Sequence, residues 1–381
     1  MKTLITGGAG FIGSRLALKL AGLGHRVTVL DSLSPQVHGA GGGFDPALAA
    51  AAECVQGDVR DRALIERLTA DQEIIVHLAA ETGTGQSMYE VERYQSVNIG
   101  GAAVLMETLV NRPPPALRKL LVASSRAIYG EGQYHCPAHG TVFPSGRSAI
   151  DLAAGRFDPV CPECSGVLSV EATREDAPFA PSSFYGLTKQ VQEQMVLMFA
   201  KVLGLDAFAL RYQNVYGPGQ SLSNPYTGIL AIFAQQARQG QAINVFEDGE
   251  ESRDFVYIDD VVEATAACLA PQATGVHALN VGGGARVSVR EVAAAIVAHF
   301  GSEAEIRVTG DFRVGDIRHN LADLSQLHAL TGFQPIWRFS EGLARFLSWA
   351  EQYIVTDGGY ETSLIELRAR GLLGTTGKDP A

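Results

Sequence analysis

Apolar positions in the chain follow two periods that alternate up to about residue 215. Short apolar runs typical of strands buried in a parallel sheet occur at residues 2–6, 26–30, 74–80 and 120–125. Segments between these runs, such as residues 11–23, carry apolar side chains at helical spacing. This alternation predicts an α/β fold of the Rossmann type, a doubly wound parallel sheet with helices on both faces.

Three glycines, Gly7, Gly10 and Gly13, follow the first predicted strand and precede a predicted helix. A strand, a turn and a helix in that order place a pyrophosphate on backbone N–H groups at the helix N-terminus. The spacing is GxxGxxG and not the common GxGxxG, so the motif alone is weak. Asp31 ends the second predicted strand, where an acid binds ribose hydroxyls and repels a 2′-phosphate. The pattern indicates NAD rather than NADP, with a solvated strand-end aspartate as the alternative.

A second motif supplies candidate acid–base chemistry. Tyr185 and Lys189 are four positions apart on a predicted helix and therefore share a face. We expect the ammonium of Lys189 to lower the pKa of the phenol, which is ordinarily about 10. Ser125 ends the predicted strand at 120–125, at the sheet edge where ligands bind, and could hydrogen-bond the reacting oxygen. A phenolate beside a nicotinamide would oxidise an alcohol to a ketone.

Several motifs in order resemble the extended short-chain dehydrogenase/reductase family, specifically its nucleotide-sugar epimerases and dehydratases. The matching segments are residues 7–13, 77–80, 124–130, 185–189, 211–218 and 253–261. The resemblance covers roughly residues 1–350. The resemblance is more specific in four segments. Their motifs are similar to those of the branch that contains dTDP-L-rhamnose 4-epimerases, and they lie at residues 85–89, 223–228, 246–249 and 313–319.

This resemblance implies site residues. The implied catalytic set is Ser125, Tyr185 and Lys189, with Ser125 preferred to Ser124. The implied NAD site comprises Gly7, Gly10, Phe11, Ile12, Gly13, Asp31, Asp58, Val59, Leu78, Ala79, Ala80, Asn98, Tyr185 and Lys189. The implied site for the nucleotide diphosphate of the substrate comprises Asn214, Arg253, Arg313 and Asp316. Guanidinium groups suit a diphosphate because they bind it bidentately, although each arginine alone would fit a surface ion pair.

The residues after Ser125 bear on the reaction. The family's 4,6-dehydratases have Asp-Glu at the positions of Arg126 and Ala127, which cannot act as that acid and base. The sequence therefore favours an NAD-dependent nucleotide-sugar 4-epimerase that passes through a transient 4-keto sugar. The alternatives are a dehydratase or reductase of the same family, or a non-catalytic NAD-binding sensor. Arg126 could face a substrate carboxylate, or pair with Glu81 or another acid.

An insertion at residues 131–174 interrupts the expected fold and has little periodicity. It contains Cys136, His139, Cys161 and Cys164, three thiolates and an imidazole that suit a tetrahedral structural Zn²⁺. We expect a zinc-knuckle-like module, against the alternative of a Cys136 disulfide, which a reducing cytosol disfavours. A lid over the sugar pocket is a further hypothesis for this loop.

We expect an NAD-binding domain at residues 1–215, a smaller substrate-binding lobe at 216–355, partly interleaved with the main sheet, and a peripheral tail at 356–381. The resemblance implies a homodimer built through predicted helices at 89–109 and 184–203. A net charge of −11 argues against a nucleic-acid partner. No apolar run is long enough for a membrane span, and no signal peptide precedes the first strand, so we expect a cytoplasmic protein.

Overall fold

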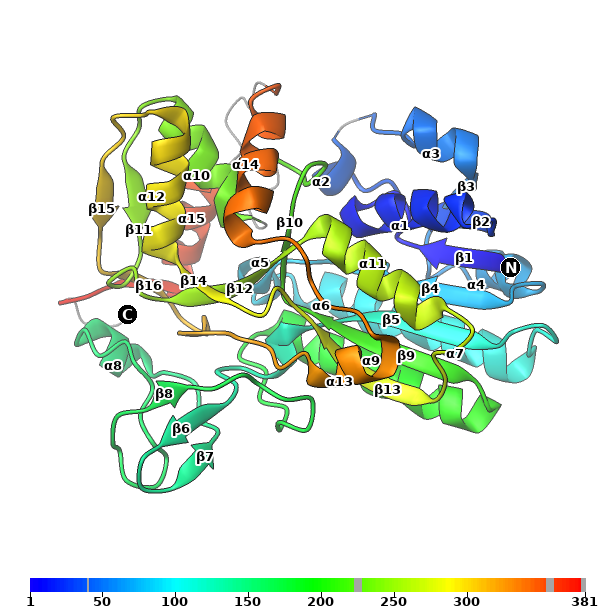
Figure 1. The fold of residues 1–381 in the computed structure, drawn as a ribbon, viewed down its shortest axis with the longest axis horizontal. Coiled ribbons are helices and arrows are strands. Elements are labelled where there is room, and N and C mark those ends of the chain that lie inside the picture. Colours follow the sequence, from blue (N-terminus) through cyan, green and yellow to red (C-terminus); the bar gives the residue numbers. More distant parts are fainter. Residues whose placement is uncertain (40, 223–227, 354–359, 378–381) are drawn as a thin grey trace.

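The computed structural model describes residues 1–39, 41–222, 228–353 and 360–377. Its main sheet has seven strands, paired in parallel in the order β13-β9-β5-β4-β1-β2-β3. These strands are β1 (Lys2–Thr6), β2 (Arg26–Asp31), β3 (Glu53–Gln56), β4 (Ile74–His77), β5 (Lys119–Ser125), β9 (Asp206–Tyr212) and β13 (Val276–Val281). The predicted doubly wound parallel sheet is confirmed (Figure 1).

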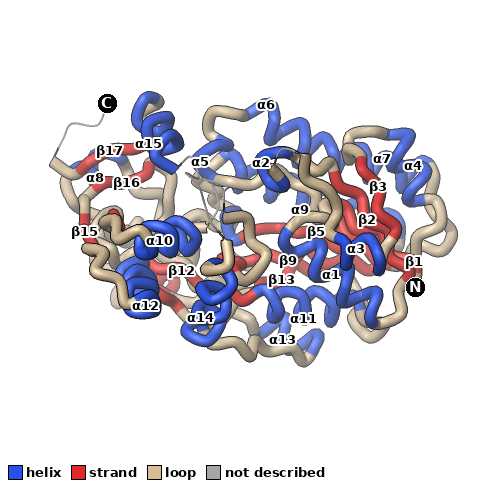
Figure 2. The backbone as a smooth tube through the Cα atoms, turned by 90° about the horizontal axis from the view of Figure 1, so that it is seen from above, coloured by secondary structure: helices blue, strands red, loops and turns tan. Residues whose placement is uncertain are grey.

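Both faces of this sheet are covered, which explains why its strands read as continuous apolar runs. Leu4 and Ile5 are neighbours on β1 and both fully buried, yet they pack into different hydrophobic clusters. One cluster includes α1 (Phe11–Gly22) and α11 (Ile258–Leu269), and the other includes α4 (Arg62–Thr69), α7 (Gly101–Asn111) and α9 (Phe184–Leu203). Figure 2 shows α1 and α11 on one side of the sheet and α4 and α7 on the other.

The two long helices predicted beside the sheet are present. Helix α9 begins after Ser183, whose hydroxyl accepts a hydrogen bond from the N–H of Gly186, and it ends at Gly204 in a left-handed conformation. The other runs through α6 (Val91–Tyr94), a π-helical turn at Gln95–Gly100, and α7. Shorter helices are α2 (Pro35–His38), α3 (Pro46–Ala51), α5 (Thr84–Ser87) and a 3₁₀ turn at Arg126–Ile128.

A second, smaller lobe lies beyond the carboxyl ends of the main strands, at the left of Figures 1 and 2. Its helices are α10 (Ile229–Arg238), α12 (Val289–Phe300), α14 (Phe339–Ala350) and α15 (Tyr360–Ala369). Its strands are β10 (Asn214–Tyr216), β11 (Ile243–Val245), β12 (Ser252–Tyr257), β14 (Arg286–Ser288), β15 (Ile306–Val308), β16 (Asp311–Arg313) and β17 (Leu373–Thr375). The chain returns to the main sheet through α11, β13 and α13 (Ser325–Thr331), so the two lobes are interleaved.

The insertion forms a module of its own. It contains β6 (Tyr134–Cys136), β7 (Gly140–Val142), β8 (Ser169–Val170) and α8 (Ala149–Ala153). Strand β6 pairs antiparallel with both β7 and β8. In Figure 1 the module projects at the lower left, away from the main sheet and below the second lobe.

The expectation of a peripheral tail at 356–381 is wrong for the part that the structure describes. Helix α15 packs against β17, and β17 pairs antiparallel with β16 of the second lobe. Leu367 and Leu373 are both buried, and the side chain of Leu367 lies beside Gly85 of α5. Residues 354–359 and 378–381, and the family-like segment at 223–227, lie outside the described residues. No described helix combines the length and apolar character needed to cross a bilayer.

Candidate active site

A cavity of about 930 Å³ follows the carboxyl ends of the main strands and continues into the second lobe. Ligands of doubly wound sheets bind at this edge. We call its two parts the cofactor end, beside Gly7, Gly10, Gly13 and Asp31, and the substrate end, beside Asn214, Arg253, Arg313 and Asp316. Ser125, Tyr185 and Lys189 also line the cavity, so one space brings together the residues that sequence motifs placed far apart.

The cofactor end is built from backbone in close contact. Gly7 has φ +69°, and a Cβ there would lie 2.7 Å from the backbone nitrogen of Ala79. A Cβ on Gly13 would lie 2.3 Å from the carbonyl oxygen of Gly7, so a side chain cannot fit. Gly10 caps α1 without a side-chain hydrogen bond to the first helical N–H groups. Those N–H groups therefore remain available to a pyrophosphate.

Asp31 is held as a carboxylate at the end of β2. It accepts hydrogen bonds from the N–H of Ala9 at 3.0 Å and of Leu33 at 2.9 Å. Burial opposes ionisation, but hydrogen bonds from His38 and these two N–H groups outweigh it and lower the pKa of Asp31. No sequence motif indicates His38, whose Nε2 lies 3.5 Å from the carboxylate. A fixed, ionised acid at this position fits a ribose with free hydroxyls.

The other predicted cofactor residues divide into two groups. Those that line the cavity are Phe11, Ile12, Asp58, Val59, Leu78, Ala79 and Ala80. Asn98 does not line it, and its amide is used elsewhere: it donates to the carbonyl of Glu81 and to Thr188, and accepts from the N–H of Glu81. The structure therefore places Asn98 as a support behind the cavity and not as a contact in it.

The geometry favours Ser125 over Ser124 as the hydroxyl beside the phenol. The Ser124 hydroxyl donates to a carboxylate oxygen of Glu193 at 2.5 Å. The Ser125 oxygen accepts from the N–H of Ala127 at 3.2 Å, which leaves its own O–H free to donate. Its interaction with Tyr185 favours the ionised phenol.

The predicted effect of Lys189 on Tyr185 is not what the structure shows. Burial raises the pKa of Tyr185, opposed by Ser125 and the positive charge of Arg126. The Lys189 ammonium instead donates to Gln192 at 2.5 Å, and burial lowers its pKa to about 7 against the opposing effect of Glu193. Helical spacing correctly placed Tyr185 and Lys189 together at the cavity. The pKa values of both groups are nevertheless set mainly by desolvation, which depends on tertiary packing.

Charged side chains dominate the substrate end. Arg253 donates to Asp316 at 3.0 Å. Burial opposes ionisation of Asp316, but Arg253, Arg126, Arg313 and Arg147, in that order, outweigh it and lower its pKa to about 2. Two polar atoms here, Nε of Arg313 and Oδ1 of Asn214, are buried without a hydrogen-bond partner among the described residues. Such orphaned groups suit a polar ligand, because they lose hydration without any internal partner.

Arg126 lies between the phenol and the substrate end. Among the described residues, no acid is within ion-pair distance of its guanidinium. Glu81 instead pairs with Arg93 at 2.7 Å, so the interpretation of an Arg126–Glu81 pair is wrong. Glu251 and Tyr360 also line the cavity and were not predicted. No sequence motif indicated Tyr360 as a site residue, because it belongs to the segment that was expected to form a peripheral tail.

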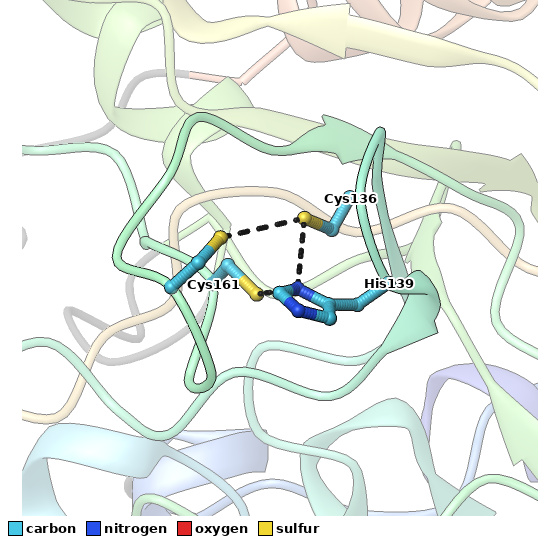
Figure 3. A group of neighbouring side chains, drawn as sticks. Cys136, His139 and Cys161 are labelled. Carbon is cyan, nitrogen blue, oxygen red and sulfur yellow. Dashed lines mark hydrogen bonds between the residues drawn. The ribbon is translucent and has the colours of Figure 1, made fainter.

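The four predicted metal ligands converge in the insertion. The candidate ligand atoms of Cys136, His139, Cys161 and Cys164 all lie within 4.8 Å of one another. Both Cys136 and Cys161 have their sulfur 3.5 Å from Nδ1 of His139, and Figure 3 shows these groups facing one another. A Zn–S bond of about 2.3 Å in a tetrahedron separates its ligands by about 3.8 Å. The spacing therefore fits a tetrahedral Zn²⁺.

A disulfide in this cluster does not fit the geometry. The sulfur atoms of Cys136 and Cys164 are 3.8 Å apart, whereas a disulfide bond is about 2.05 Å long. All five cysteines are free thiols.

The parallel sheet, the side-chain-free glycine turn, the fixed acid on β2 and the Ser–Tyr–Lys set define an NAD-dependent short-chain dehydrogenase/reductase site. Sequence comparison gives the family. The NAD dependent epimerase/dehydratase family profile matches residues 3–146 and 160–282. The chain belongs to this family. The match is interrupted at residues 147–159, inside the insertion.

Named relatives agree with this assignment. The chain is 40% identical over 354 residues to a dTDP-L-rhamnose 4-epimerase of Burkholderia thailandensis, covering 92% of this chain and 95% of the relative. It is 31% identical to a UDP-glucose 4-epimerase of Mycolicibacterium smegmatis, covering 91% and 97%. A UDP-glucose 4-epimerase of Thermotoga maritima, solved with UDP-glucose, aligns with a TM-score of 0.74 at 28% identity, covering 92% and 99%. The Thermus thermophilus enzyme, solved with NAD, aligns with a TM-score of 0.72 at 28% identity, covering 93% and 100%.

Proposed function

We propose that this chain is an NAD-dependent 4-epimerase of a nucleoside diphosphate sugar, and that the sugar is a dTDP-linked 6-deoxyhexose of the L-rhamnose type. The observation that carries the reaction is the placement of Ser125 and Tyr185 midway along one cavity, between a dinucleotide turn and a cluster of arginines. The 40% identity to a dTDP-L-rhamnose 4-epimerase over 92% of the chain supports the choice of sugar.

The residues divide the chemistry as follows. Tyr185 takes the proton of the 4-hydroxyl as a general base, and Ser125 donates a hydrogen bond to the same oxygen. When bound, NAD supplies the hydride acceptor for the first half-reaction and, reduced, the donor for the second. Arg253 and Arg313 bind the diphosphate, which anchors the substrate while the 4-keto sugar turns its other face. Tyr185 then returns the proton. The hydride would return to the sugar as well, so the reaction needs no net oxidant.

The test is to incubate the purified protein with dTDP-L-rhamnose and with UDP- and GDP-hexoses, and to follow the products by NMR. We expect inversion at C4 of the dTDP-6-deoxyhexose with no net change in NADH absorbance. Loss of water from the sugar would instead assign a dehydratase, and net consumption of NADH would assign a reductase. A protein that binds NAD and converts none of these sugars would support the sensor alternative.

We also propose a structural Zn²⁺ at Cys136, His139, Cys161 and Cys164. Four protein ligands leave no open coordination position, so the ion would stabilise the insertion and take no part in the reaction. Elemental analysis of protein purified without chelator should find one zinc per chain. Cys161→Ser should lose it, whereas Cys54→Ser, which removes a thiol far from the cluster in sequence, should retain it.

The homodimer remains a proposal as well. A groove between α7 and α9 is lined largely by apolar side chains, including Met106, Val110, Met195, Met198 and Phe199. Met198 is 55% exposed in the single chain, so a second copy would bury it. Met198→Glu should convert a dimer to a monomer in light scattering, whereas Ile336→Glu, at an exposed site on another part of the surface, should not.

A further inference from the structure

The insertion lies beside the substrate end of the cavity. None of the described residues 131–174 lines the cavity itself, so this structure gives no contact that supports the hypothesis of a lid. The insertion instead contacts the substrate end on the side that does not line the cavity. Buried charged side chains make these contacts. What it contacts there is the short segment that carries Asp316 and Arg318.

Arg147 makes the central contact. Its side chain is 2% exposed, and its guanidinium has partners on every nitrogen. Nε donates to Glu131 at 3.1 Å, within the insertion. Nη1 donates to both carboxylate oxygens of Glu247 at 2.8 and 2.7 Å, and Nη2 donates to the backbone carbonyl of Asp316 at 3.0 Å. The residue therefore connects the insertion to two segments of the second lobe.

The same segment is held from a second side. Arg318 donates through Nε to Asp158 of the insertion at 2.8 Å and through both terminal nitrogens to Asp248 at 2.7 Å. Its backbone N–H donates to Glu131 of the insertion at 2.8 Å. The carbonyl oxygen of Arg318 accepts from Arg253 at 3.1 Å. Arg253 is thereby fixed both by the side chain of Asp316 and by the backbone two residues later.

The metal cluster closes the loop that carries these contacts. His139 and Cys161 are consecutive ligands in the sequence, and the chain between them contains both Arg147 and Asp158. A metal that joins the two ends of this loop reduces its conformational freedom and so favours the arrangement of the side chains along it. Residues 147–159 are also the stretch at which the family match is interrupted, so these contacts are additions to the shared fold.

We propose that the metal-binding insertion positions the substrate end for the nucleotide diphosphate, with Arg147 as the positioning residue. Arg147 fixes the peptide of Asp316, Asp316 fixes Arg253, and Arg253 contacts the ligand. The inference rests on the proposed function only in taking a nucleoside diphosphate as the ligand of Arg253. It predicts an effect on the binding of the nucleotide, with the chemistry at Tyr185 and the cofactor end left intact.

The test compares Arg147→Gln with Arg156→Gln in the full chain. Arg156 belongs to the same insertion and pairs with Asp151, but its side chain is 62% exposed. For Arg147→Gln we expect the Kd for dTDP and the KM for the sugar nucleotide to rise about tenfold or more, because buried charges lose a partner. We expect kcat to change less than about threefold, and NAD affinity to remain at the wild-type value. Arg156→Gln should have wild-type Kd and KM values. Arg147→Lys keeps the positive charge but lacks the several N–H donors of a guanidinium, so its Kd and KM should lie between those of wild type and Arg147→Gln.

A dTDP affinity and KM unchanged in Arg147→Gln would overturn the proposal. Equal losses of kcat, NAD affinity and dTDP affinity would overturn it too, because they would indicate a general defect in folding. Because dTDP binding is measured without turnover, the comparison of variants remains valid even if the wild-type protein converts no sugar. That outcome would contradict the proposed function and would leave the role of Arg147 to be decided by the binding data.

The metal arm uses the wild-type chain. Stripping with a chelator should raise the Kd for dTDP by a similar factor, and reloading with Zn²⁺ should restore it. NAD affinity should stay constant throughout. Protein that holds no metal as purified and binds dTDP equally well with and without added Zn²⁺ would refute the role of the metal, while Arg147→Gln tests the remaining contact independently.

Discussion

The two ends of the cavity are built by different physical means. The cofactor end uses backbone N–H groups and the absence of side chains at Gly7 and Gly13. The substrate end uses guanidinium and carboxylate groups that neutralise one another, as at Arg253, which is buried, and Asp316, which is partly exposed. The first depends on shape within a few consecutive residues, whereas the second depends on charges brought from distant parts of the chain.

This difference indicates which substitutions should weaken binding at each end. A site formed by closely packed backbone should lose its ligand when a side-chain atom is added, because there is no space for that atom. A site of paired charges is weakened when a member is removed, because a buried partner is left unpaired. Tyr185 lies between the two ends and shares features of both, since burial raises its pKa while a neighbouring cation lowers it.

Tyr185→Phe should have the largest effect and should separate chemistry from binding at either end. Removing the hydroxyl removes the proton acceptor, so we expect kcat to fall by about 10²- to 10⁴-fold. The Kd for dTDP should not change, as measured by calorimetry. Tyr353→Phe, at a residue that is about half exposed, is the matched control and should retain full activity. Equal activity in both variants would contradict the proposed mechanism.

Arg253→Gln should disable the substrate end alone. The change leaves Asp316 without its closest cation, so we expect KM to rise by about 30-fold or more, equivalent to at least about 2 kcal/mol. NAD affinity should match wild type. The control is Arg307→Gln, which removes an arginine whose pair with Glu305 is exposed on the same lobe. If NAD affinity fell as far as substrate affinity, the two ends would not be independent.

Gly13→Ala should disable the cofactor end alone. The added Cβ would overlap the carbonyl of Gly7, so we expect NAD affinity to fall at least about tenfold, measured by fluorescence titration. Gly22→Ala lies in the same helix with no atom within 4 Å of the new Cβ. It should bind NAD normally and be more stable by about 0.5 to 1 kcal/mol. Normal NAD binding by Gly13→Ala would refute the close-contact argument.

Arg126→Ala should have the smallest effect and should show which end that residue serves. Its positive charge lowers the pKa of Tyr185, so its removal should raise that pKa further. Because the phenolate is the reactive form, the rising limb of kcat/KM against pH should move to higher pH. Arg156→Gln should leave the profile in place. An unmoved profile with a raised KM would assign Arg126 to the substrate instead.

Sequence alone predicted what is encoded locally. The strands of the parallel sheet, the glycine turn, Asp31, the helix from Phe184 and the metal cluster each have a signature within a few residues or a repeated spacing. The contacts of Arg147 had none, because its partners Glu247 and Asp316 lie 100 and 169 positions away. The same holds for His38 beside Asp31, since a histidine in a loop gives no sign of its partner.

Two other failures have a different cause. The pKa of Tyr185 was expected to fall because Lys189 shares its helix face, but desolvation depends on the packing of the whole domain. Asn98 was assigned to the cofactor by resemblance, yet its amide is consumed by the backbone of Glu81 and by Thr188. In both cases the residue was located correctly, and its surroundings decided its role.

The pairing of β17 with β16 has a practical consequence for handling the protein. In this pairing Leu373 lies opposite Arg313, so β17 supports the backbone of a residue of the substrate end. Met1, in contrast, lies at the amino-terminal end of β1, whereas the cavity follows the carboxyl ends of the strands. Immobilisation on a sensor surface should therefore go through the amino terminus, since anchoring near β17 would strain the very residues whose ligand is being measured.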